Sequence, residues 1–168
     1  DLVAGGGFGL RGGVQQLMAE CSAQGVAMAI TTTTSRSNVQ ALMTAHFGQR
    51  WPSLFGAVVC GEDVHRKKPD PAVFEQALQQ LKLGPLEALA IEDSPGGVAA
   101  ARAAHVPVLV TLSAYFENAT LEGAIAIGPG LDQRAGWRPA LGAAADVRVT
   151  LADLRQWHAA ADTVSQYA

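Results

Sequence analysis

Short, continuous apolar runs alternate along this chain with segments whose apolar residues recur at helical spacing. The runs that predict strands, with their exit loops, occupy residues 26–30, 55–64, 87–93 and 106–112. Strands that are apolar on both faces are typical of parallel sheets covered by helices on each side. Helices between successive strands also supply the long crossovers that parallel strands need. The sequence therefore predicts an α/β fold with a doubly wound, Rossmann-like parallel sheet.

The helical patterns between these runs are bounded by ordinary start and stop signals. Helices are predicted within residues 13–24, 39–46, 69–83 and 94–105. Gly25 is expected to cap the first helix, because glycine adopts the left-handed conformation found at helix ends. Pro71 is expected to open the third helix and Gly84 to close it.

The carboxyl-terminal third of the chain is less regular. Residues 113–145 have weak periodicity and much Gly and Pro, which predicts irregular surface with one short strand near residues 123–128. Residues 145–157 predict a short strand that leads into a last helix.

Length and composition bound the class of protein. The chain has 168 residues, 49% of them hydrophobic, which predicts one globular domain spanning residues 1–168. The formal net charge is −3 and the basic residues are scattered, so we expect no nucleic-acid partner. No apolar run approaches the roughly 20 residues of a spanning helix, so we expect no membrane partner. Cys21 and Cys60 lie in neither a CxxC motif nor a histidine-containing ligand pattern, which favours a reducing compartment and a cytoplasmic location.

Three polar segments follow predicted strands, at the edge where ligands of open parallel sheets bind. They read TTTTS from Thr31, GEDVHRKK from Gly61 and EDSPGG from Glu92. Because the carboxyl ends of parallel strands meet at one edge of the sheet, we expect these segments to lie near one another. The sequence therefore predicts a functional site at this edge.

Glu92 and Asp93 are adjacent carboxylates at the end of a strand expected to be buried. Neighbouring carboxylates repel, so a cation is expected nearby. One interpretation is a site for a hard divalent cation such as Mg²⁺, which prefers oxygen ligands. The other is helix capping, since Ser94 is a good N-cap and Pro95 suits the first helical position.

The other two segments also have two interpretations each. Lys68 is either a solvated surface charge, as Lys67 is expected to be, or a cation held rigidly over the site because Pro69 restricts its backbone. The hydroxyls and helix-start amides of residues 31–35 either cap the next helix or receive a phosphate group.

Together the three segments resemble the haloacid dehalogenase-like hydrolase superfamily. AITTTTSRSNV, RKKPDPAVFEQAL and AIEDSPGGVAAARAA are similar to its second, third and fourth motifs. The resemblance extends from about Leu10 to His158 and lies in the branch of phosphoglycolate phosphatase and β-phosphoglucomutase. It is closest to the sugar-bisphosphate phosphatases associated with rubisco.

The resemblance implies roles for the polar residues of the three motifs. Thr32 would donate its hydroxyl to the transferred phosphoryl group, with Thr31 and Thr33 as alternative registers, and Lys68 would stabilise negative charge. Asp93 would bind Mg²⁺, with Glu92 as a further ligand or as its support. The predicted polar contacts to substrate come from Thr33, Ser35 and Asn38. The resemblance implies a Mg²⁺-dependent phosphatase-type hydrolase, and its partner would be a small phosphorylated sugar or acid.

The chain departs from the family in its first motif. The family has Asp-x-Asp-Gly-Thr at the end of a first strand, and these 168 residues contain no Asp-x-Asp. We therefore expect a core domain that lacks the first strand and the helical cap, is the carboxyl-terminal portion of a longer protein, and has little activity alone. The alternatives are a non-catalytic relic or interaction module and a sugar-phosphate mutase fragment. Unpaired strand edges would favour self-association or binding of a missing amino-terminal half.

Overall fold

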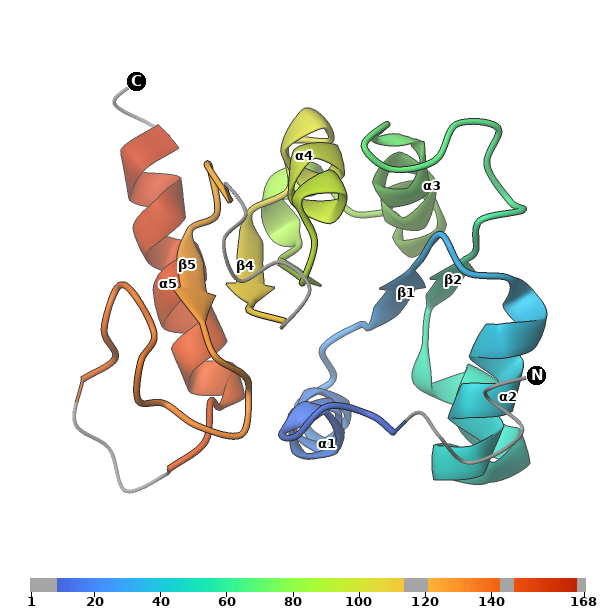
Figure 1. The fold of residues 1–168 in the computed structure, drawn as a ribbon, viewed down its shortest axis with the longest axis horizontal. Coiled ribbons are helices and arrows are strands. Elements are labelled where there is room, and N and C mark those ends of the chain that lie inside the picture. The colour runs from blue at the N-terminus through green and yellow to red at the C-terminus, as the bar shows by residue number, and fades with distance from the viewer. Residues whose placement is uncertain (1–8, 114–120, 143–146, 166–168) are drawn as a thin grey trace.

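A computed structural model describes residues 9–113, 121–142 and 147–165 (Figure 1). The helices and strands in chain order are α1 (Val14–Ala23), β1 (Ala29–Thr31), α2 (Arg36–Phe47), η1 (Gly48–Leu54), β2 (Ala57–Val59), α3 (Ala72–Leu81), η2 (Pro85–Glu87), β3 (Ala90–Glu92), α4 (Pro95–Ala103), β4 (Val108–Thr111), β5 (Ala126–Gly128) and α5 (Leu151–Ser165). Each predicted helix is present. Strands occur at the four predicted runs, with β1 extending one residue beyond its run, and also within residues 123–128. None of the helices in this part of the chain has the length and hydropathy to cross a bilayer.

The strands form two parallel sheets that lie side by side. β1 pairs with β2, and Ala29 lies opposite Ala57. The second sheet has the order β3-β4-β5, with Ala90 opposite Val108 and Leu109 opposite Ala126. In the described residues β1 and β3 each have one paired neighbour, so the strand pairing is interrupted between the two sheets (Figure 1). We call this interruption between β1 and β3 the slot. The predicted parallel α/β fold is confirmed, with this interruption in its middle.

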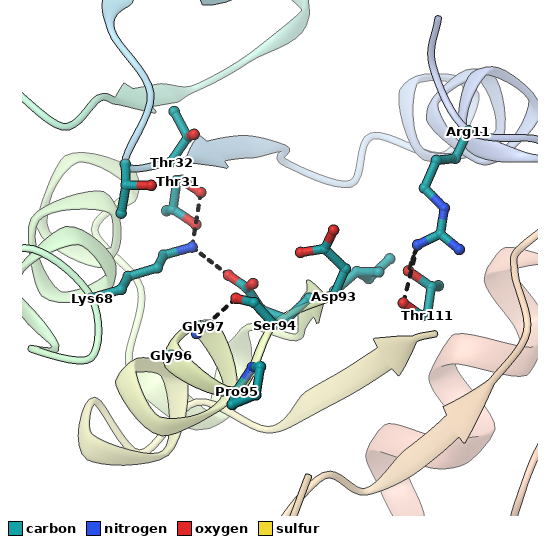
Figure 2. Close-up of a pocket in the computed structure, with 13 residues that line it drawn as sticks. Arg11, Thr31, Thr32, Lys68, Asp93, Ser94, Pro95, Gly96, Gly97 and Thr111 are labelled. Atoms are coloured by element: carbon teal, nitrogen blue, oxygen red, sulfur yellow. Dashed lines mark hydrogen bonds and ion pairs between the residues drawn. The ribbon is translucent and has the colours of Figure 1, made fainter. Parts of the chain in front are cut away.

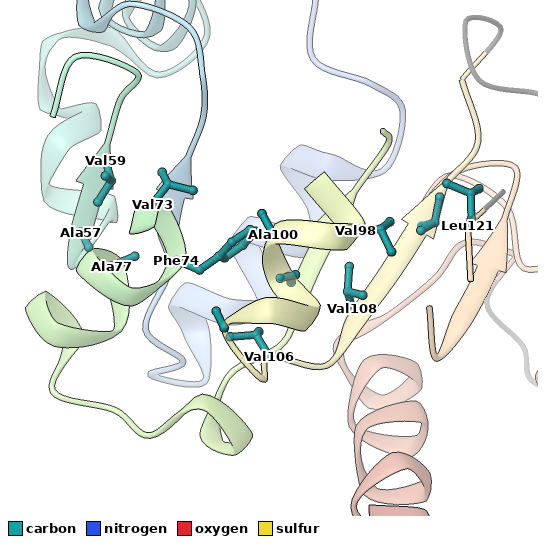
Figure 3. Packing of buried hydrophobic residues seen from close by; sticks show 14 residues of the cluster. Ala57, Val59, Val73, Phe74, Ala77, Val98, Ala100, Val106, Val108 and Leu121 are labelled. Atoms are coloured by element: carbon teal, nitrogen blue, oxygen red, sulfur yellow. The ribbon is translucent and has the colours of Figure 1, made fainter. Parts of the chain in front are cut away.

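Helices cover both faces of the sheets. Val108 and Val110 of β4 pack into a cluster with residues of α3 and α4, which Figure 3 shows extending from β2 across both helices to β4. Leu109, between them, faces a second cluster formed with residues of α1 and α5. Alternate residues of one strand thus enter different cores, which is the packing expected of a doubly wound sheet.

Local signals set most helix ends, but two predictions for α3 need correction. Gly25 has a φ of 67° just after α1, as predicted. However, Gly84 does not close α3, because the helix ends at Leu81 and Lys82 takes the left-handed conformation with a φ of 57°. Pro71 is the residue before α3 rather than its first residue. Pro95 does occupy the first position of α4, and Ser94 caps it by accepting from the Gly97 N–H at 3.1 Å.

Two strand predictions also need correction. The described part of the segment before α5, residues 147–150, forms no strand. Its Val149 N–H donates to the Leu131 carbonyl at 2.9 Å, so an irregular loop satisfies this backbone instead. β1 was expected to be buried, but Ala29 is exposed. Among the described residues, no strand pairs with the other edge of β1, which agrees with this exposure.

Candidate active site

The loops after β1, β2 and β3 meet at a single cavity (Figure 2). The cavity has a volume of about 650 Å³ and is lined by Arg11, Thr31, Thr32, Thr33, Lys68, Ile91, Glu92, Asp93, Ser94, Pro95, Gly96, Gly97 and Thr111. It lies at the carboxyl edge of the sheets, between β1 and β3. The structure therefore brings residues from all three predicted motifs together at the predicted edge.

Lys68 and Glu92 form a buried ion pair inside this cavity. Lys68 Nζ contacts the Glu92 carboxylate and donates to the Thr31 carbonyl at 3.1 Å. The two side chains are only 10% and 8% exposed. Lys68 Nζ also lies 4.9 Å from the centre of the Phe74 ring, a favourable position for a cation. Lys68 is thus a fixed cation, and it is the positive group that the adjacent carboxylates were predicted to need.

The packing around Glu92 is tight because α4 begins beside it. A Cβ atom at Gly97 would lie 1.8 Å from Glu92 Oε2, whereas a Cβ at Gly96 would meet nothing within 4 Å. Only glycine at position 97 leaves room for the carboxylate in its present position. The helix start and the ion pair therefore depend on each other. The capping interpretation of this segment is confirmed at Ser94 and Pro95, and the metal-site interpretation stays a prediction.

Asp93 differs from its neighbour Glu92. Its side chain is exposed at the cavity, and within residues 9–113, 121–142 and 147–165 it has no hydrogen-bond or ion-pair partner. Figure 2 shows its carboxylate directed into the space between β1 and β4 rather than toward Lys68. A carboxylate in this position is available to bind a cation.

The oxygen atoms in the cavity could supply part of the coordination shell of a Mg²⁺ ion. Asp93 offers hard oxygen ligands, which Mg²⁺ prefers, while Glu92 is committed to Lys68. The described residues contain no group of three His, Cys, Asp or Glu side chains placed to hold a metal ion. Asp93 would therefore be the protein ligand from this chain, with Glu92 behind it, and the remaining ligands would have to be supplied from elsewhere.

The threonine loop after β1 supplies hydroxyls, but its residues differ in position. Thr32 and Thr33 line the cavity, and Thr32 Oγ1 accepts from the Thr34 N–H at 3.1 Å. The Thr32 O–H has no acceptor in the described part of the chain, so it can donate to a ligand. Ser35 instead caps α2 by accepting from the backbone N–H of Asn38 at 3.4 Å, and neither residue belongs to the cavity lining. The predicted substrate contacts of Ser35 and Asn38 stay predictions.

Arg11 lies on the opposite wall of the cavity and was not identified from the sequence as a site residue. Its Nη1 donates to the Thr111 carbonyl at 3.0 Å and to Thr111 Oγ1 at 2.7 Å. Its Nη2 donates to the carbonyls of Leu112 at 2.6 Å and Pro129 at 3.2 Å. Arg11 thus fastens the segment before α1 to the ends of β4 and β5. Its partners are about 100 residues away and mainly backbone, so no spacing in the sequence indicates them.

The loops after β1 and β2 are joined by a second ion pair outside the cavity. Arg36 Nη2 donates to Asp63 Oδ2 at 2.5 Å, and the same oxygen accepts from the Cys60 N–H at 2.7 Å. The Cys60 N–H, followed by the Arg36 guanidinium, holds the pKa of the Asp63 carboxyl below its ordinary value. The Asp63 carboxylate is therefore charged at neutral pH.

Comparison with known proteins identifies relatives over most of the chain. The family model for haloacid dehalogenase-like hydrolases matches residues 8–111. Protein CbbY encoded on a plasmid of Cupriavidus necator is 40% identical over 159 residues, which cover 94% of this chain and 63% of that protein. Protein CbbY of Rhodobacter capsulatus is 44% identical over 115 residues, or 68% of this chain and 51% of that protein.

Solved structures give the same relationship. A mutant CbbY from Rhodobacter sphaeroides in complex with xylulose-(1,5)bisphosphate has a TM-score of 0.76 at 35% identity, covering 80% of this chain and 60% of that chain. A β-phosphoglucomutase from Clostridium difficile has a TM-score of 0.69 over 92% of this chain, but at 14% identity it shows the fold alone. The chain spans about half to two thirds of the length of the CbbY proteins that it matches.

Proposed function

Because the chain belongs to the haloacid dehalogenase-like hydrolase family, we propose that it carries part of a Mg²⁺-dependent phosphatase site for small phosphorylated sugars or acids. The observation that carries this proposal is the single cavity at the carboxyl edge of the sheets. It combines a buried cation on Lys68, a hydroxyl donor on Thr32 and the carboxylate of Asp93, which has no partner among the described residues. The relatives named CbbY and the bisphosphate in one of their structures support a phosphorylated substrate.

Each residue would perform a separate task on a phosphate ester. Lys68 Nζ has a third N–H beyond its two present partners, and its charge would stabilise negative phosphoryl oxygens. The Thr32 hydroxyl would donate a hydrogen bond to the same group. Asp93 would hold Mg²⁺, which when bound supplies neutralisation of the charge that develops during phosphoryl transfer. Glu92 would keep Lys68 oriented.

The sequence contains no Asp-x-Asp, and the described residues offer no second free carboxylate in this cavity that could attack phosphorus. We therefore propose that these residues have little turnover alone. The test is release of phosphate from a generic phosphomonoester with Mg²⁺, by the 168-residue chain alone and with the amino-terminal half of a CbbY relative added in trans. Activity that appears only on addition, and is lost in Asp93→Asn, supports the proposal. No activity in either mixture contradicts it.

A second candidate function is a non-catalytic interaction module. The observation that favours it is the slot between β1 and β3, since unpaired strand edges bind other strands. We propose that this slot accepts an extended segment from an amino-terminal half or from another copy of the chain. Sedimentation of the chain alone and with the added half separates these partners. The fold likeness to β-phosphoglucomutase gives no support to mutase activity, because its identity is 14%.

The proposed setting is the cytoplasm, where small phosphorylated metabolites occur. Both cysteines are free and buried in the structure, which agrees with a reducing compartment. Fractionation of cells that express the protein tests this location, and recovery outside the cytoplasmic fraction contradicts it.

A further inference from the structure

The loop after β1 and the loop after β2 continue the pairing of their strands beyond the sheet. The Thr32 N–H donates to the Val59 carbonyl at 3.0 Å, and the Gly61 N–H donates to the Thr34 carbonyl at 3.0 Å. The next link is made by side chains, because the Arg36 N–H donates to the Glu62 carboxylate at 3.1 Å. Alternate residues of the first loop, which we call the hydroxyl loop (Thr32–Ser35), are therefore fastened to the second loop.

The close approach of the two loops leaves little freedom in the middle of the hydroxyl loop. A Cβ atom at Gly61 would lie 2.2 Å from the Thr33 carbonyl oxygen, which is backbone and unable to move aside alone. The second loop therefore packs directly against the backbone of the hydroxyl loop at Thr33. Glycine at position 61 permits this contact.

The ion pair of Arg36 and Asp63 joins the two loops beyond these backbone hydrogen bonds. Arg36 is the first residue of α2, directly after the hydroxyl loop. Asp63 lies in the turn after β2, and its carboxylate accepts a hydrogen bond from the Cys60 N–H at the start of that turn. Exposed ion pairs contribute little by themselves, and the Arg36 side chain is 47% exposed. The Asp63 carboxylate, however, has two donors on one oxygen, one of them from the fully buried Cys60. The Asp63 carboxylate therefore links Arg36, at the start of α2, to the buried backbone of Cys60.

We propose that Arg36 and Asp63 are positioning residues that hold the hydroxyl loop in the conformation that presents Thr32 to the cavity. This inference rests on the proposed function, because the loop matters only if the cavity receives a phosphate group. Neither residue lines the cavity, so their effect on a bound anion would pass through the loop. Their loss would weaken anion binding by letting the loop adopt other conformations.

The test uses the 168-residue chain and inorganic phosphate as the probe. Asp63→Asn keeps an acceptor for the Cys60 N–H and removes the charge, and Arg36→Gln removes the other partner. Arg155→Gln is the matched control, because Arg155 is an exposed arginine on α5 with one side-chain bond to Gln24. The readouts are hydrogen exchange of the Gly61 amide and the Kd of phosphate by calorimetry in Mg²⁺ buffer.

In Asp63→Asn and Arg36→Gln we expect up to about fivefold faster exchange at Gly61 and up to about fivefold weaker phosphate binding, since the partly exposed charge-assisted bond between α2 and the second loop is lost. Arg36→Lys should bind phosphate within about twofold of wild type, because it keeps the positive charge beside Asp63. The control should change neither readout. Unchanged exchange in both variants overturns the inference. Faster exchange with unchanged phosphate affinity also overturns it, because the pair is then structural only.

Failure of the proposed function gives a different result. If the wild-type chain binds no phosphate at millimolar concentration, the phosphate site itself is wrong. The exchange measurement then still decides whether Arg36 and Asp63 hold the loop, since it requires no ligand. The two failures are therefore distinguishable in one set of samples.

Discussion

The two sheets of this molecule differ in how well their strands are covered. Every side chain of β4, in the middle of the three-stranded sheet, is buried, whereas no residue of β1 is buried. β3, on the other side of the slot, leaves Ile91 38% exposed. The apolar pattern of a strand thus predicts that its side chains are buried. The strands and helices that pack beside it determine whether they are. β1 and Ile91 of β3 border the slot, and the carboxyl ends of these two strands contribute Thr31, Glu92 and Asp93 to the cavity.

Contacts across the slot hold the two sheets in one arrangement. On one face, α3 from the first sheet packs on α4 from the second, and Phe74 lies near Ala100 in the shared cluster (Figure 3). At the carboxyl edge, Lys68 reaches from the loop before α3 to Glu92 at the end of β3. The first contact is apolar and extensive, and the second is a single buried charge pair. Its removal is the sharpest way to test how far the two sheets depend on each other.

Lys68→Met should have the largest effect on stability. The substitution leaves the Glu92 carboxylate buried without its cation, which typically costs about 3 kcal/mol. Urea denaturation of the variant measures the free energy of unfolding. The control is Lys67→Met at the adjacent exposed lysine, which should change it by less than about 0.5 kcal/mol. Equal free energies of unfolding for the two variants would mean that the Lys68–Glu92 pair does not stabilise the fold.

Gly97→Ala should be the next largest change, at about 2 kcal/mol of destabilisation. The new methyl group would collide with the Glu92 carboxylate, and the carboxylate could move only by leaving Lys68. Gly96→Ala is a control one residue away in the same helix turn, with open space around the added atom. It should stabilise the protein by about 0.5 kcal/mol, because alanine favours the helix. Thermal unfolding of both variants should therefore shift in opposite directions, and a shift of Gly97→Ala to higher temperature would contradict the collision.

The same comparison shows what the sequence can predict. Apolar periodicity located the strands and helices, and the rule that ligands gather at the carboxyl ends of parallel strands located Lys68 and Asp93 at one cavity. Periodicity did not locate the end of α3, because the left-handed conformation at Lys82 has no sequence signal as strong as glycine. It also did not indicate Arg11, whose partners are backbone carbonyls brought close only by the complete fold. Residues that bond to the backbone of distant loops are the ones that local patterns miss.

Arg11→Ala should have a smaller effect, confined to the three-stranded sheet. The guanidinium donates four hydrogen bonds to the ends of β4 and β5, and the side chain is partly open to water, so we expect a loss of about 1 kcal/mol. Hydrogen exchange should increase at Leu112 after β4 and stay unchanged at Thr32 after β1. Arg50→Ala, at an exposed arginine on η1, is the control. Faster exchange at Thr32 as well would show that Arg11 stabilises both sheets.

The smallest expected effect is the pH dependence of Asp63 in the two-stranded sheet. Its folded-state pKa lies below the ordinary value of 3.8, because the Cys60 N–H and the Arg36 guanidinium favour the carboxylate. A lowered folded-state pKa means that the carboxylate stabilises the fold above about pH 4, and that this contribution is lost as the pH falls through the folded-state pKa. The pair is 47% and 23% exposed, so the contribution should be under about 1 kcal/mol.

The measurement is the difference in free energy of unfolding between wild type and Asp63→Asn, obtained from urea denaturation at several pH values. The difference should be constant from pH 7 to about 5 and shrink below about 4, since the asparagine cannot ionise. Taking this difference cancels the titration of the other carboxylates, which both proteins share. A difference that grows as the pH falls would mean that the Asp63 carboxylate is destabilised in the fold, and that the β1 and β2 loops are joined by their backbone contacts alone.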